Sequence, residues 1–374
     1  MEKLFFFFLS YMGRFESTLD KYCPTKEIAM LDELKMIETV APDIINVLQK
    51  RYKILRNIYW MQPIGRRCLS ESMGITERVL RTETNLLKQL ELINTSKSGM
   101  TLTPKGKEAY QNLESLMDQF LGRRQTEKKL ADYFGNQRCI VVSGNSEEQS
   151  KVADAFGEAL TEALDLLLPE GNNIIAVMGG TTMAVVAEQL TNLENKQRHN
   201  LFVPARGGIG EAVTVQANSI SARMAAKANG KHRALYVPEQ LSLATYNSLL
   251  NEPSIQEVLN LISQANCVIH SIGRALHMAA RRKMTEEELV MLKQANAVAE
   301  SFGYFFNENG EVVYKVPRIG IELKGLANIP IILAIAGGKV KAKAIRAYMK
   351  NAPKQTWLIT DEAAAKEILK GVSL

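Results

Sequence analysis

Seven short apolar runs recur along the chain after residue 138, and a stretch with helical spacing follows each of them. The runs are Cys139–Gly144, Ile174–Gly180, Leu201–Gly208, Ala234–Pro238, Cys267–Gly273, Ile331–Gly338 and Thr356–Thr360. Strands of this kind, alternating with helices, predict a parallel sheet covered on both faces. We therefore expect an α/β fold with a doubly wound parallel sheet, in which ligands bind beyond the carboxyl ends of the strands. Asn309 and Gly310, between two further strand-like runs, predict a hairpin at the edge of this domain.

The second apolar run ends in the sequence GGTT, and Met183, Val186 and Leu190 then recur at helical spacing. This order predicts a strand, a tight turn and a helix capped by one of the two threonines. The amide groups of the first helical turn form an anion site. The turn has neither GxGxxG nor GxxxxGK[ST] spacing, so the expected ligand is a small phosphate ester rather than a nucleotide. Glycine and threonine also join strands to helices where no ligand binds, and that alternative stays open.

The segment before the α/β part has the pattern of a helix-turn-helix. We expect a helix over 42–61, a short helix over 67–72, a turn at 73–75 and a second helix over 76–90 with Thr76 as its cap. We expect Val79, Leu80, Leu86, Leu87 and Leu90 to face the core of this domain. Arginine, asparagine and threonine on the outer face would read base edges in the major groove. The candidate DNA-binding residues are Arg66, Arg67, Thr76, Arg78, Arg81, Thr82, Asn85 and Lys97. The alternative is an ordinary solvated helix.

Residues 92–110 alternate as in a small hairpin around Lys97, Ser98 and Gly99, which is typical of the wing of a winged helix. Lys97, Lys105 and Lys107 would then lie near phosphate groups. A following helix over 106–121 could pair with its copy in a second subunit, as two half-sites on DNA require. The working unit is thus expected to be a dimer or a tetramer.

Charge is distributed unevenly along the chain. Residues 50–129 carry sixteen Lys and Arg against eight Asp and Glu, which indicates a polyanionic partner for the front half. The polar stretch 121–129 is the expected boundary, which gives a DNA-binding domain over 37–122 and an effector domain over 123–374. Residues 1–36 include the run LFFFFLSYM, which is too short for a membrane span and lacks the cleavage site of a signal peptide. We interpret them as an upstream extension of the reading frame or as a disordered or docking tail.

Motifs across both halves carry a resemblance to one family. The sequences PIGRRCLSESMGITERVLR, GGTTMAVVAEQL, LFVPARGGIGE, FGYFFNENGEVVYKV and AIAGGKVKAKAI occur in this order. In these motifs the chain resembles the SorC family of sugar-responsive bacterial repressors over about residues 40–372. The resemblance implies a cytoplasmic repressor of glycolytic genes, with an effector domain folded like sugar-phosphate isomerases and deaminases. It also implies operator DNA as partner and fructose 1,6-bisphosphate as inducer, with no cofactor and no membrane.

The same resemblance implies an effector site, residue by residue. One phosphate would lie on Gly179, Gly180, Thr181 and Thr182, joined by Lys341. Arg206, Gln216 and Arg281 would contact the second phosphate and the sugar, and Glu300 would accept hydrogen bonds from sugar hydroxyls. Lys339 is a further cation beside the glycine loop, and the sequence does not decide whether it faces the ligand.

An enzyme is the alternative reading: a sugar-phosphate isomerase or deaminase fused to a DNA-binding module. Such chemistry needs a base within reach of a substrate C–H near the phosphate loop. Glu300, Glu322, Asp361 and His270 are candidates, but no two form a recognisable acid and base pair, so we expect no catalytic residue. Four cysteines without CxxC spacing or nearby histidines predict idle thiols and no metal site.

Overall fold

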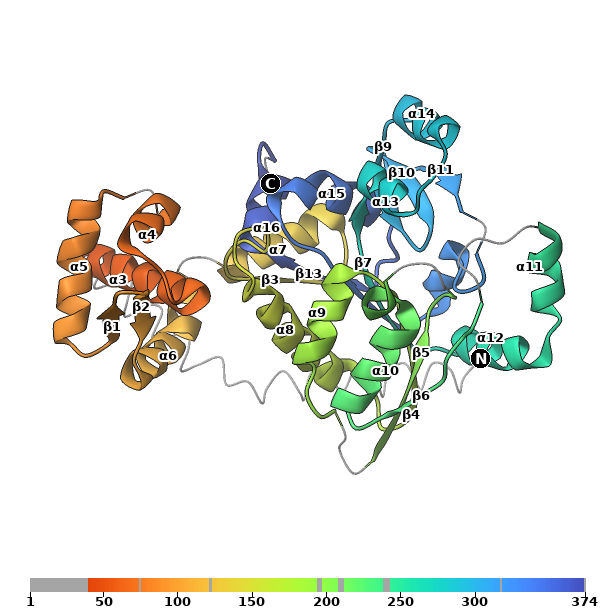
Figure 1. Ribbon diagram of the computed structural model, residues 1–374, viewed down its shortest axis with the longest axis horizontal. Helices are drawn as coiled ribbons and strands as arrows, with labels where there is room; N and C mark the ends of the chain where they lie inside the picture. Colours follow the sequence, from red (N-terminus) through yellow and green to blue (C-terminus); the bar gives the residue numbers. More distant parts are fainter. Residues whose placement is uncertain are drawn as a thin grey trace. The chain divides into compact units, whose positions relative to one another are not determined.

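The computed structural model of the chain describes residues 40–73, 75–120, 123–193, 197–207, 212–237, 243–316 and 318–372. The chain divides into two compact units, Met1–Arg124 and Gln125–Leu374, and each is described by itself (Figure 1). Residues 1–36, for which the sequence suggested an extension or tail, lie outside the described residues. So does Gly74, in the predicted turn of the helix-turn-helix.

The N-terminal unit is a small helical domain with a two-stranded hairpin. Its elements in chain order are α3 (Pro42–Met61), α4 (Arg66–Met73), α5 (Glu77–Gln89), β1 (Ile93–Ser96), β2 (Gly99–Leu102) and α6 (Pro104–Phe120). Strands β1 and β2 are antiparallel, with Ile93 opposite Leu102 and Ser96 opposite Gly99. This is the predicted winged helix-turn-helix, and α4 and α5 are its two helices.

Helix α5 begins as predicted but buries a different face. The Thr76 hydroxyl accepts a hydrogen bond from the Val79 amide at 3.4 Å, which caps the helix. Leu80 and Leu87 are buried, but the expectation for Val79 and Leu90 was wrong, because these side chains are 42% and 45% exposed. Positions 80, 83, 84 and 87 lie on one helical face, so Glu83 and Thr84 complete the buried stripe instead.

Polar partners make the burial of Glu83 and Thr84 tolerable. The Glu83 carboxylate accepts from Lys50 Nζ and from Arg51 Nε, each at 3.1 Å, and both donors lie on α3. The Thr84 hydroxyl donates to the carbonyl of Leu80 at 2.8 Å. Buried polar groups that are paired in this way cost little, and the Glu83 ion pairs also join α5 to α3.

The polar stretch 121–129, predicted as the domain boundary, is helical from Arg123 onward. Helix α7 spans Arg123–Phe134, and its charged residues surround an apolar stripe in which Leu130 and Phe134 are buried. These two side chains pack into the core of the C-terminal unit. The Glu127 carboxylate also accepts from the backbone amide of Val141 at 2.8 Å. The many charged residues of α7 make its apolar stripe hard to recognise in the sequence, because a few apolar positions are enough to pack a helix against a core.

The C-terminal unit is built on a parallel sheet with the strand order β3-β13-β12-β7-β4-β5-β6. Its strands are β3 (Arg138–Val142), β4 (Gly171–Val177), β5 (Arg198–Pro204), β6 (Lys231–His232), β7 (Cys267–Ser271), β12 (Ile331–Ile335) and β13 (Thr356–Asp361). The helices and 3-10 turns between them are α8 (Val152–Leu167), α9 (Thr181–Gln189), η1 (Val213–Val215), α10 (Ala217–Lys227), α11 (Leu243–Leu250), α12 (Pro253–Ser263), η2 (Leu323–Asn328), η3 (Lys339–Lys341), α15 (Ala342–Lys350) and α16 (Glu362–Leu369).

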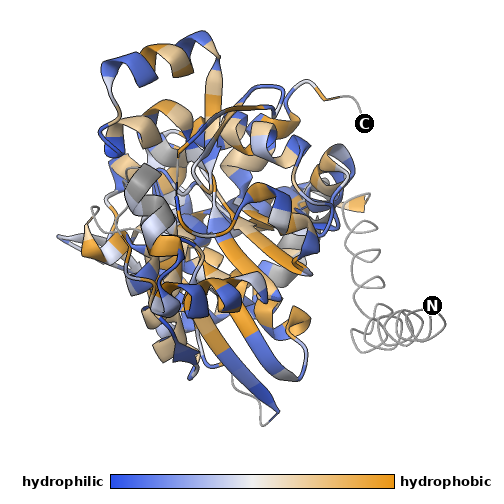
Figure 2. Cartoon of the chain, turned by 90° about the vertical axis from the view of Figure 1, so that its right-hand side faces the viewer, coloured by the Kyte–Doolittle hydropathy of each residue, from blue (hydrophilic) through white to orange (hydrophobic). Residues whose placement is uncertain are grey.

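Helices cover both faces of this sheet, as the sequence predicted. Alternate strand residues such as Ala176 and Val268 pack in one core with α7, α12 and α16. The residues between them, such as Ile175 and Ile269, are equally buried and face the other way. Helices α8, α9 and α10 pack against one another and onto the strands. Figure 2 shows the central strands in orange over much of their length, with blue at their lower ends and along parts of the helices.

One predicted strand is absent. The run Ala234–Pro238 forms no strand over its described residues, and the pairing with β5 is confined to Lys231–His232 and the following amide of Arg233. Leu235 and Val237 are still buried. The Asn218 side chain on α10 bonds both the amide and the carbonyl of Leu235 at 2.9 Å. A side-chain amide thus replaces a neighbouring strand, which hydropathy alone cannot reveal.

A second sheet lies beside the first and contains the predicted hairpin. It is antiparallel, in the order β11-β10-β9-β8, with β8 (Gly273–Arg274), β9 (Ala297–Ser301), β10 (Tyr304–Asn307) and β11 (Val312–Lys315). Helices α13 (Ala275–Arg281) and α14 (Glu286–Gln294) pack on it around the buried ring of Phe305. The hairpin turn at Asn309 and Gly310 lies outside the parallel sheet, as expected.

Candidate functional site

The carboxyl ends of the parallel strands bring four separate loops to one edge of the sheet. The loop after β4 holds Gly179 to Thr182, and the loop after β5 holds Arg206. The chain after β7 enters β8 and α13, and the loop after β12 holds Gly337 to Lys341. Parallel pairing fixes these ends at the same edge, so the predicted site residues come from segments far apart in the sequence.

Gly180, rather than a threonine, occupies the cap position of α9. Its φ of 132° lies where residues with a Cβ are strained, and no side chain caps the helix. Thr181 and Thr182 are the first two helical residues, so the prediction that one of them caps α9 was wrong. The Thr181 side chain is exposed and Thr182 is half-buried. Both threonines therefore lie in the first turn of α9, whose backbone amide groups have no acceptor within the helix.

Gln216 lies beside this turn, although only the resemblance had placed it there. The Gly180 amide donates to the Val215 carbonyl at 2.9 Å. A Cβ built on Gly179 would lie 2.8 Å from that same carbonyl oxygen and 3.5 Å from the carbonyl carbon of Gln216. The glycine at 179 thus permits a close approach between the turn and the start of α10.

Lys341 reaches the same turn from the other side. Its Nζ donates to the Thr182 hydroxyl at 3.4 Å, which joins the loop after β12 to α9. Burial lowers the pKa of Lys341, and Arg274 and Arg281 lower it further, while Asp361 and Glu147 oppose the shift. Two arginines therefore lie within electrostatic reach of a half-buried lysine.

Acidic side chains hold the loop around Lys341 in place. Asp361 Oδ2 accepts from the amides of Gly338 and Ser146, each at 2.8 Å. The Glu147 carboxylate accepts from the Val340 amide at 3.0 Å. Lys339 is exposed and its Nζ lies 3.9 Å from the carboxylate of Glu367 on α16. Of the two lysines, the structure brings Lys341 to the GGTT turn and pairs Lys339 with Glu367.

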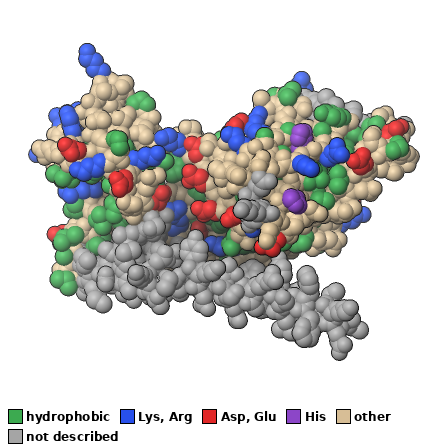
Figure 3. Space-filling view, turned by 90° about the horizontal axis from the view of Figure 1, so that it is seen from below, with side chains coloured by type: hydrophobic (Ala, Val, Ile, Leu, Met, Phe, Trp, Pro, Cys, Tyr) green, Lys and Arg blue, Asp and Glu red, His purple; other side chains and the backbone are tan. Residues whose placement is uncertain are grey.

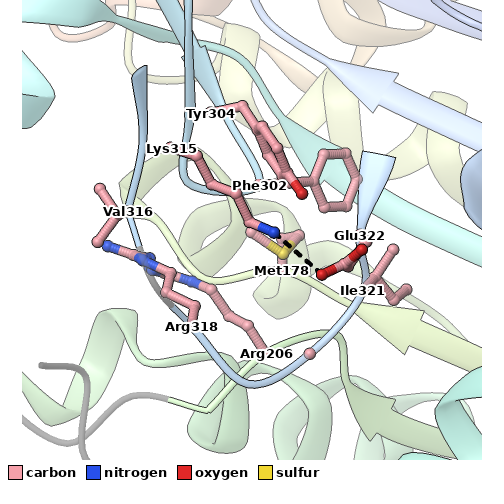
Figure 4. A pocket seen from close by; sticks show the side chains of 10 residues that line it. Met178, Arg206, Phe302, Tyr304, Lys315, Val316, Arg318, Ile321 and Glu322 are labelled. Atoms are coloured by element: carbon pink, nitrogen blue, oxygen red, sulfur yellow. Dashed lines mark hydrogen bonds and ion pairs between the residues drawn. The ribbon is translucent and has the colours of Figure 1, made fainter. Parts of the chain in front are cut away.

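Arg206 lines a pocket at the same edge and is only 9% exposed. The pocket also includes Met178, at the end of β4, and Tyr304, Lys315, Arg318 and Glu322 (Figure 4). Backbone pairing fixes the wall that Arg206 occupies, because Arg206 and Gly320 form a β-bridge and the Ile321 amide donates to Ala205 at 2.8 Å. The sequence reasoning missed Arg318, whose stem packs against the surface of Gly303.

Glu300 is buried in an ion pair rather than exposed. Its Oε1 accepts from Arg282 Nη2 at 2.8 Å and from the Gly303 amide at 2.7 Å. Both side chains are about 5% exposed or less. The resemblance had offered Glu300 as an acceptor for sugar hydroxyls, and the structure gives this carboxylate two internal donors. Arg282, next to the candidate Arg281, was not singled out from the sequence.

The candidate bases of the enzyme alternative are all engaged. His270 is fully buried, bonds Ser301 Oγ at 3.1 Å and Tyr348 Oη at 3.3 Å, and burial lowers its pKa to about 3. Asp361 caps α16 and the glycine loop, and Glu322 pairs with Lys315 at 3.0 Å. A neutral core histidine and paired carboxylates do not form an acid and base pair facing a common space.

The candidate DNA-contacting residues form an exposed set on the N-terminal unit. All eight are exposed: Arg66, Arg67, Thr76, Arg78, Arg81, Thr82, Asn85 and Lys97. Lys97 lies in the hairpin turn, while Lys105 donates to the carbonyl of Leu90 at the end of α5. Figure 3 shows several Lys and Arg side chains, with a few Asp and Glu side chains among them, on the visible face of this unit, at left. Exposed cations on a recognition helix and a wing suit phosphate and base-edge contacts.

Neither a metal cluster nor a membrane helix is found in the described part of the chain. No group of three or more His, Cys, Asp and Glu side chains there could hold a metal ion. The helices of the described residues are all too short or too polar to cross a bilayer. Cys139 and Cys267 are buried, and burial raises the pKa of the Cys139 thiol to about 12, whereas Cys68 is exposed.

Comparisons with known proteins agree with both units. Residues 118–370 match the family described as "Putative sugar-binding domain", and residues 47–117 match the CggR N-terminal DNA binding domain. A solved structure of a SorC family transcriptional regulator from Enterococcus faecalis is 75% identical, with a TM-score of 0.64, over 66% of this chain and 99% of that one. The chain belongs to the SorC family.

Relatives in this family extend the likeness to nearly the whole chain. Central glycolytic genes regulators from Priestia megaterium and Bacillus subtilis are each 47% identical over 329 residues, which are 88% of this chain and 96% of theirs. The full-length sorbitol operon regulator SorC from Klebsiella pneumoniae shares the fold, with a TM-score of 0.60 over 87% of this chain and 99% of its own, at 17% identity. The chain is thus a transcriptional regulator with a DNA-binding and a sugar-binding domain, rather than an enzyme, as the sequence predicted.

Proposed function

We propose that the chain represses glycolytic genes and releases its operator DNA when fructose 1,6-bisphosphate binds to the C-terminal unit. The proposal for the target genes follows the two relatives at 47% identity. The proposal for the effector follows the carboxyl edge of the parallel sheet, where a helix start and several cations meet. The observation that best supports this effector is the 3.4 Å contact between Lys341 Nζ and the Thr182 hydroxyl. It puts a cation beside the N-terminus of α9, and anions bind at such helix ends.

Each end of the sugar would have its own group of donors. The turn of Gly179, Gly180, Thr181 and Thr182, with Lys341, would hold one phosphate. Arg206, Gln216 and Arg281 would contact the second phosphate and the sugar. Glu300, through its ion pair with Arg282, would fix the antiparallel sheet behind the sugar, and its second oxygen could accept from a hydroxyl.

The N-terminal unit would supply the operator contacts. Arg78, Arg81, Thr82 and Asn85 on α5 would read base edges in the major groove, and Lys97 in the wing would contact phosphate. Arg66 and Arg67 on α4 would contact the backbone beside them. A dimer or tetramer acting in the cytoplasm is part of the proposal, because a helix that reads one half-site requires a copy for the second.

Equilibrium binding by the full chain tests the effector assignment. Isothermal titration with fructose 1,6-bisphosphate should give saturable binding without added metal or nucleotide. Thermal unfolding gives a second readout, since a ligand at about 100 times its Kd stabilises the folded state by about 2.7 kcal/mol. No heat of binding and an unchanged melting temperature would overturn the assignment.

A further inference from the structure

Val79 is an exposed apolar residue near the start of α5, the second helix of the helix-turn-helix. The sequence predicted a core position for it, but its side chain is 42% exposed. Helix α5 instead fills the core with Leu80 and Leu87. The backbone amide of Val79 donates to the Thr76 hydroxyl that caps α5, so this valine lies in the first helical turn. Its isopropyl group is therefore available to a partner, at the end of the helix that meets base edges in a helix-turn-helix.

Thr82 adds a methyl group beside Val79. The two residues are three positions apart on α5, so their side chains are neighbours on the helix surface. Thr82 is also exposed, and its hydroxyl donates to the Arg78 carbonyl at 3.2 Å, which uses the hydroxyl proton within the helix. Toward a partner Thr82 therefore offers a methyl group and an oxygen acceptor. Val79 and Thr82 together form a small apolar surface, which we call the valine–threonine patch.

Polar and charged side chains around this patch indicate what it meets. Arg78, Arg81 and Asn85 are exposed on the same helix. In the major groove arginine reads guanine and asparagine reads adenine through hydrogen bonds, which an isopropyl group cannot form. The apolar group that the major groove presents is the C5 methyl of thymine. Contact between this methyl and the valine–threonine patch would remove apolar surface from water on both sides.

We propose that Val79, together with Thr82, reads a thymine methyl group in the operator of this regulator. The inference rests on the proposed function for the placement of α5 in the major groove, and it adds a specificity-determining residue to that helix. Cytosine has no methyl group at this position and presents an amino donor, which Val79 cannot pair. The valine–threonine patch therefore selects thymine over cytosine at one base pair.

Replacement of thymine by deoxyuridine isolates this contact. The full chain first selects a preferred duplex from a random pool, and single thymines of that duplex are then replaced by deoxyuridine. The replacement removes the methyl group and keeps the O4 acceptor of the base. At one thymine the wild type should lose affinity about threefold to fivefold, the loss expected when one methyl group is no longer buried. Anisotropy measures each Kd at one salt concentration, because phosphate contacts depend on salt.

Val79→Ala should show the same loss on the unmodified duplex. Its Kd should rise about threefold to fivefold, and deoxyuridine at the contacted thymine should weaken its binding no further. At every other thymine the factors for the variant and for the replacement should multiply, because changes at distant sites are independent. Alanine has a higher helix propensity than valine, so α5 should stay intact, and the melting temperature of the variant checks this.

Leu90→Ala is the matched control on the same helix. Leu90 is 45% exposed, as Val79 nearly is, but it lies at the C-terminal cap of α5. This variant should bind every duplex as the wild type does. Thr82→Ser removes one methyl group and keeps the hydroxyl, so it should reduce the loss that deoxyuridine causes at the contacted thymine.

Arg81→Ala separates failure of this inference from failure of the proposed function. If Arg81→Ala loses its preference for the selected duplex, while Val79→Ala loses the same factor as the wild type at every thymine, α5 still reads the operator and the inference about Val79 is overturned. A selected duplex without thymine would overturn it as well. If Arg81→Ala and Val79→Ala both bind as the wild type does, the proposed placement of α5 is wrong and the inference falls with it.

Discussion

The Nζ atom of Lys341 lies 3.4 Å from the hydroxyl oxygen of Thr182, although 159 residues separate them in the chain. This contact joins the loop after β12 to the first turn of α9, which are brought together only by the parallel sheet. Lys339, two residues earlier, instead pairs with Glu367 at 3.9 Å. Lys339 and Lys341 carry the same charge on the same loop, so variants of the two compare a lysine that contacts the GGTT turn with one that does not.

Lys341→Met should weaken the binding of fructose 1,6-bisphosphate about tenfold to hundredfold. A hydrogen bond to a charged group contributes roughly 1.5–3 kcal/mol, and the Nζ of Lys341 donates to Thr182 in the GGTT turn. Lys339→Met is the control and should change the Kd less than threefold. Isothermal titration of the full chain measures both. Equal losses in the two variants would mean that only the general charge of the loop matters.

Gly180→Ala should impair the turn itself. A Cβ at this position is strained by the φ of 132° and would lie 3.2 Å from the Ser271 hydroxyl oxygen. We expect a lower melting temperature and weaker binding of the sugar bisphosphate. Gly325→Ala is the control, since a Cβ there meets nothing within 4 Å. Unchanged binding by Gly180→Ala would argue against a role for the amide groups of this turn.

The recognition helix and the wing should respond differently to substitution. Arg78→Ala or Arg81→Ala should cost about 1–3 kcal/mol on the preferred duplex and reduce its advantage over unrelated DNA. Lys97→Ala should weaken binding to all sequences and lower the dependence on salt. The preferred duplex can be selected by the chain from a random pool, and anisotropy across a salt series measures each variant. Lys231→Ala, an exposed lysine on β6 of the other unit, should have no effect.

Glu83→Gln should destabilise the N-terminal unit by about 1 kcal/mol at pH 7, because Lys50 and Arg51 lose their carboxylate partner. These donors hold the pKa of Glu83 below 4.5, against the opposing effect of burial. The difference between variant and wild type should therefore be present above pH 4.5 and vanish as the pH falls through the lower, folded-state pKa. Urea unfolding followed by Trp60 fluorescence, in a Trp357→Phe background, measures it. A difference that persists at low pH would assign the effect to shape instead of charge.

The sequence predicted most elements because their signals are local. Strand-length apolar runs, the GGTT turn and the Thr76 cap each depend on a few neighbouring residues, and the structure places all three as expected apart from the cap of α9 and the strand predicted over Ala234–Pro238. The errors concern partners distant in the sequence. Leu235 is bonded by Asn218 instead of a strand, and Glu83 is buried because α3 supplies Lys50 and Arg51.

The candidate site shows the same division. The GGTT turn could be read from its own residues, whereas Gln216 and Lys341 reach it only through the order of the strands. Pattern alone therefore identified one part of the candidate site, and the order of the strands brings the other parts to it.

Release of DNA by the sugar bisphosphate tests the central claim most directly. The measurement is the anisotropy of the selected duplex bound to the full chain, titrated with fructose 1,6-bisphosphate and, separately, with fructose 6-phosphate. A ligand shifts the protein only toward the state that binds it more tightly, and two phosphates would engage both Lys341 and Arg206. We predict release by the bisphosphate alone, and no release from Arg281→Ala, which should still bind the duplex. Equal release by both sugars, or normal release from Arg281→Ala, would contradict the account.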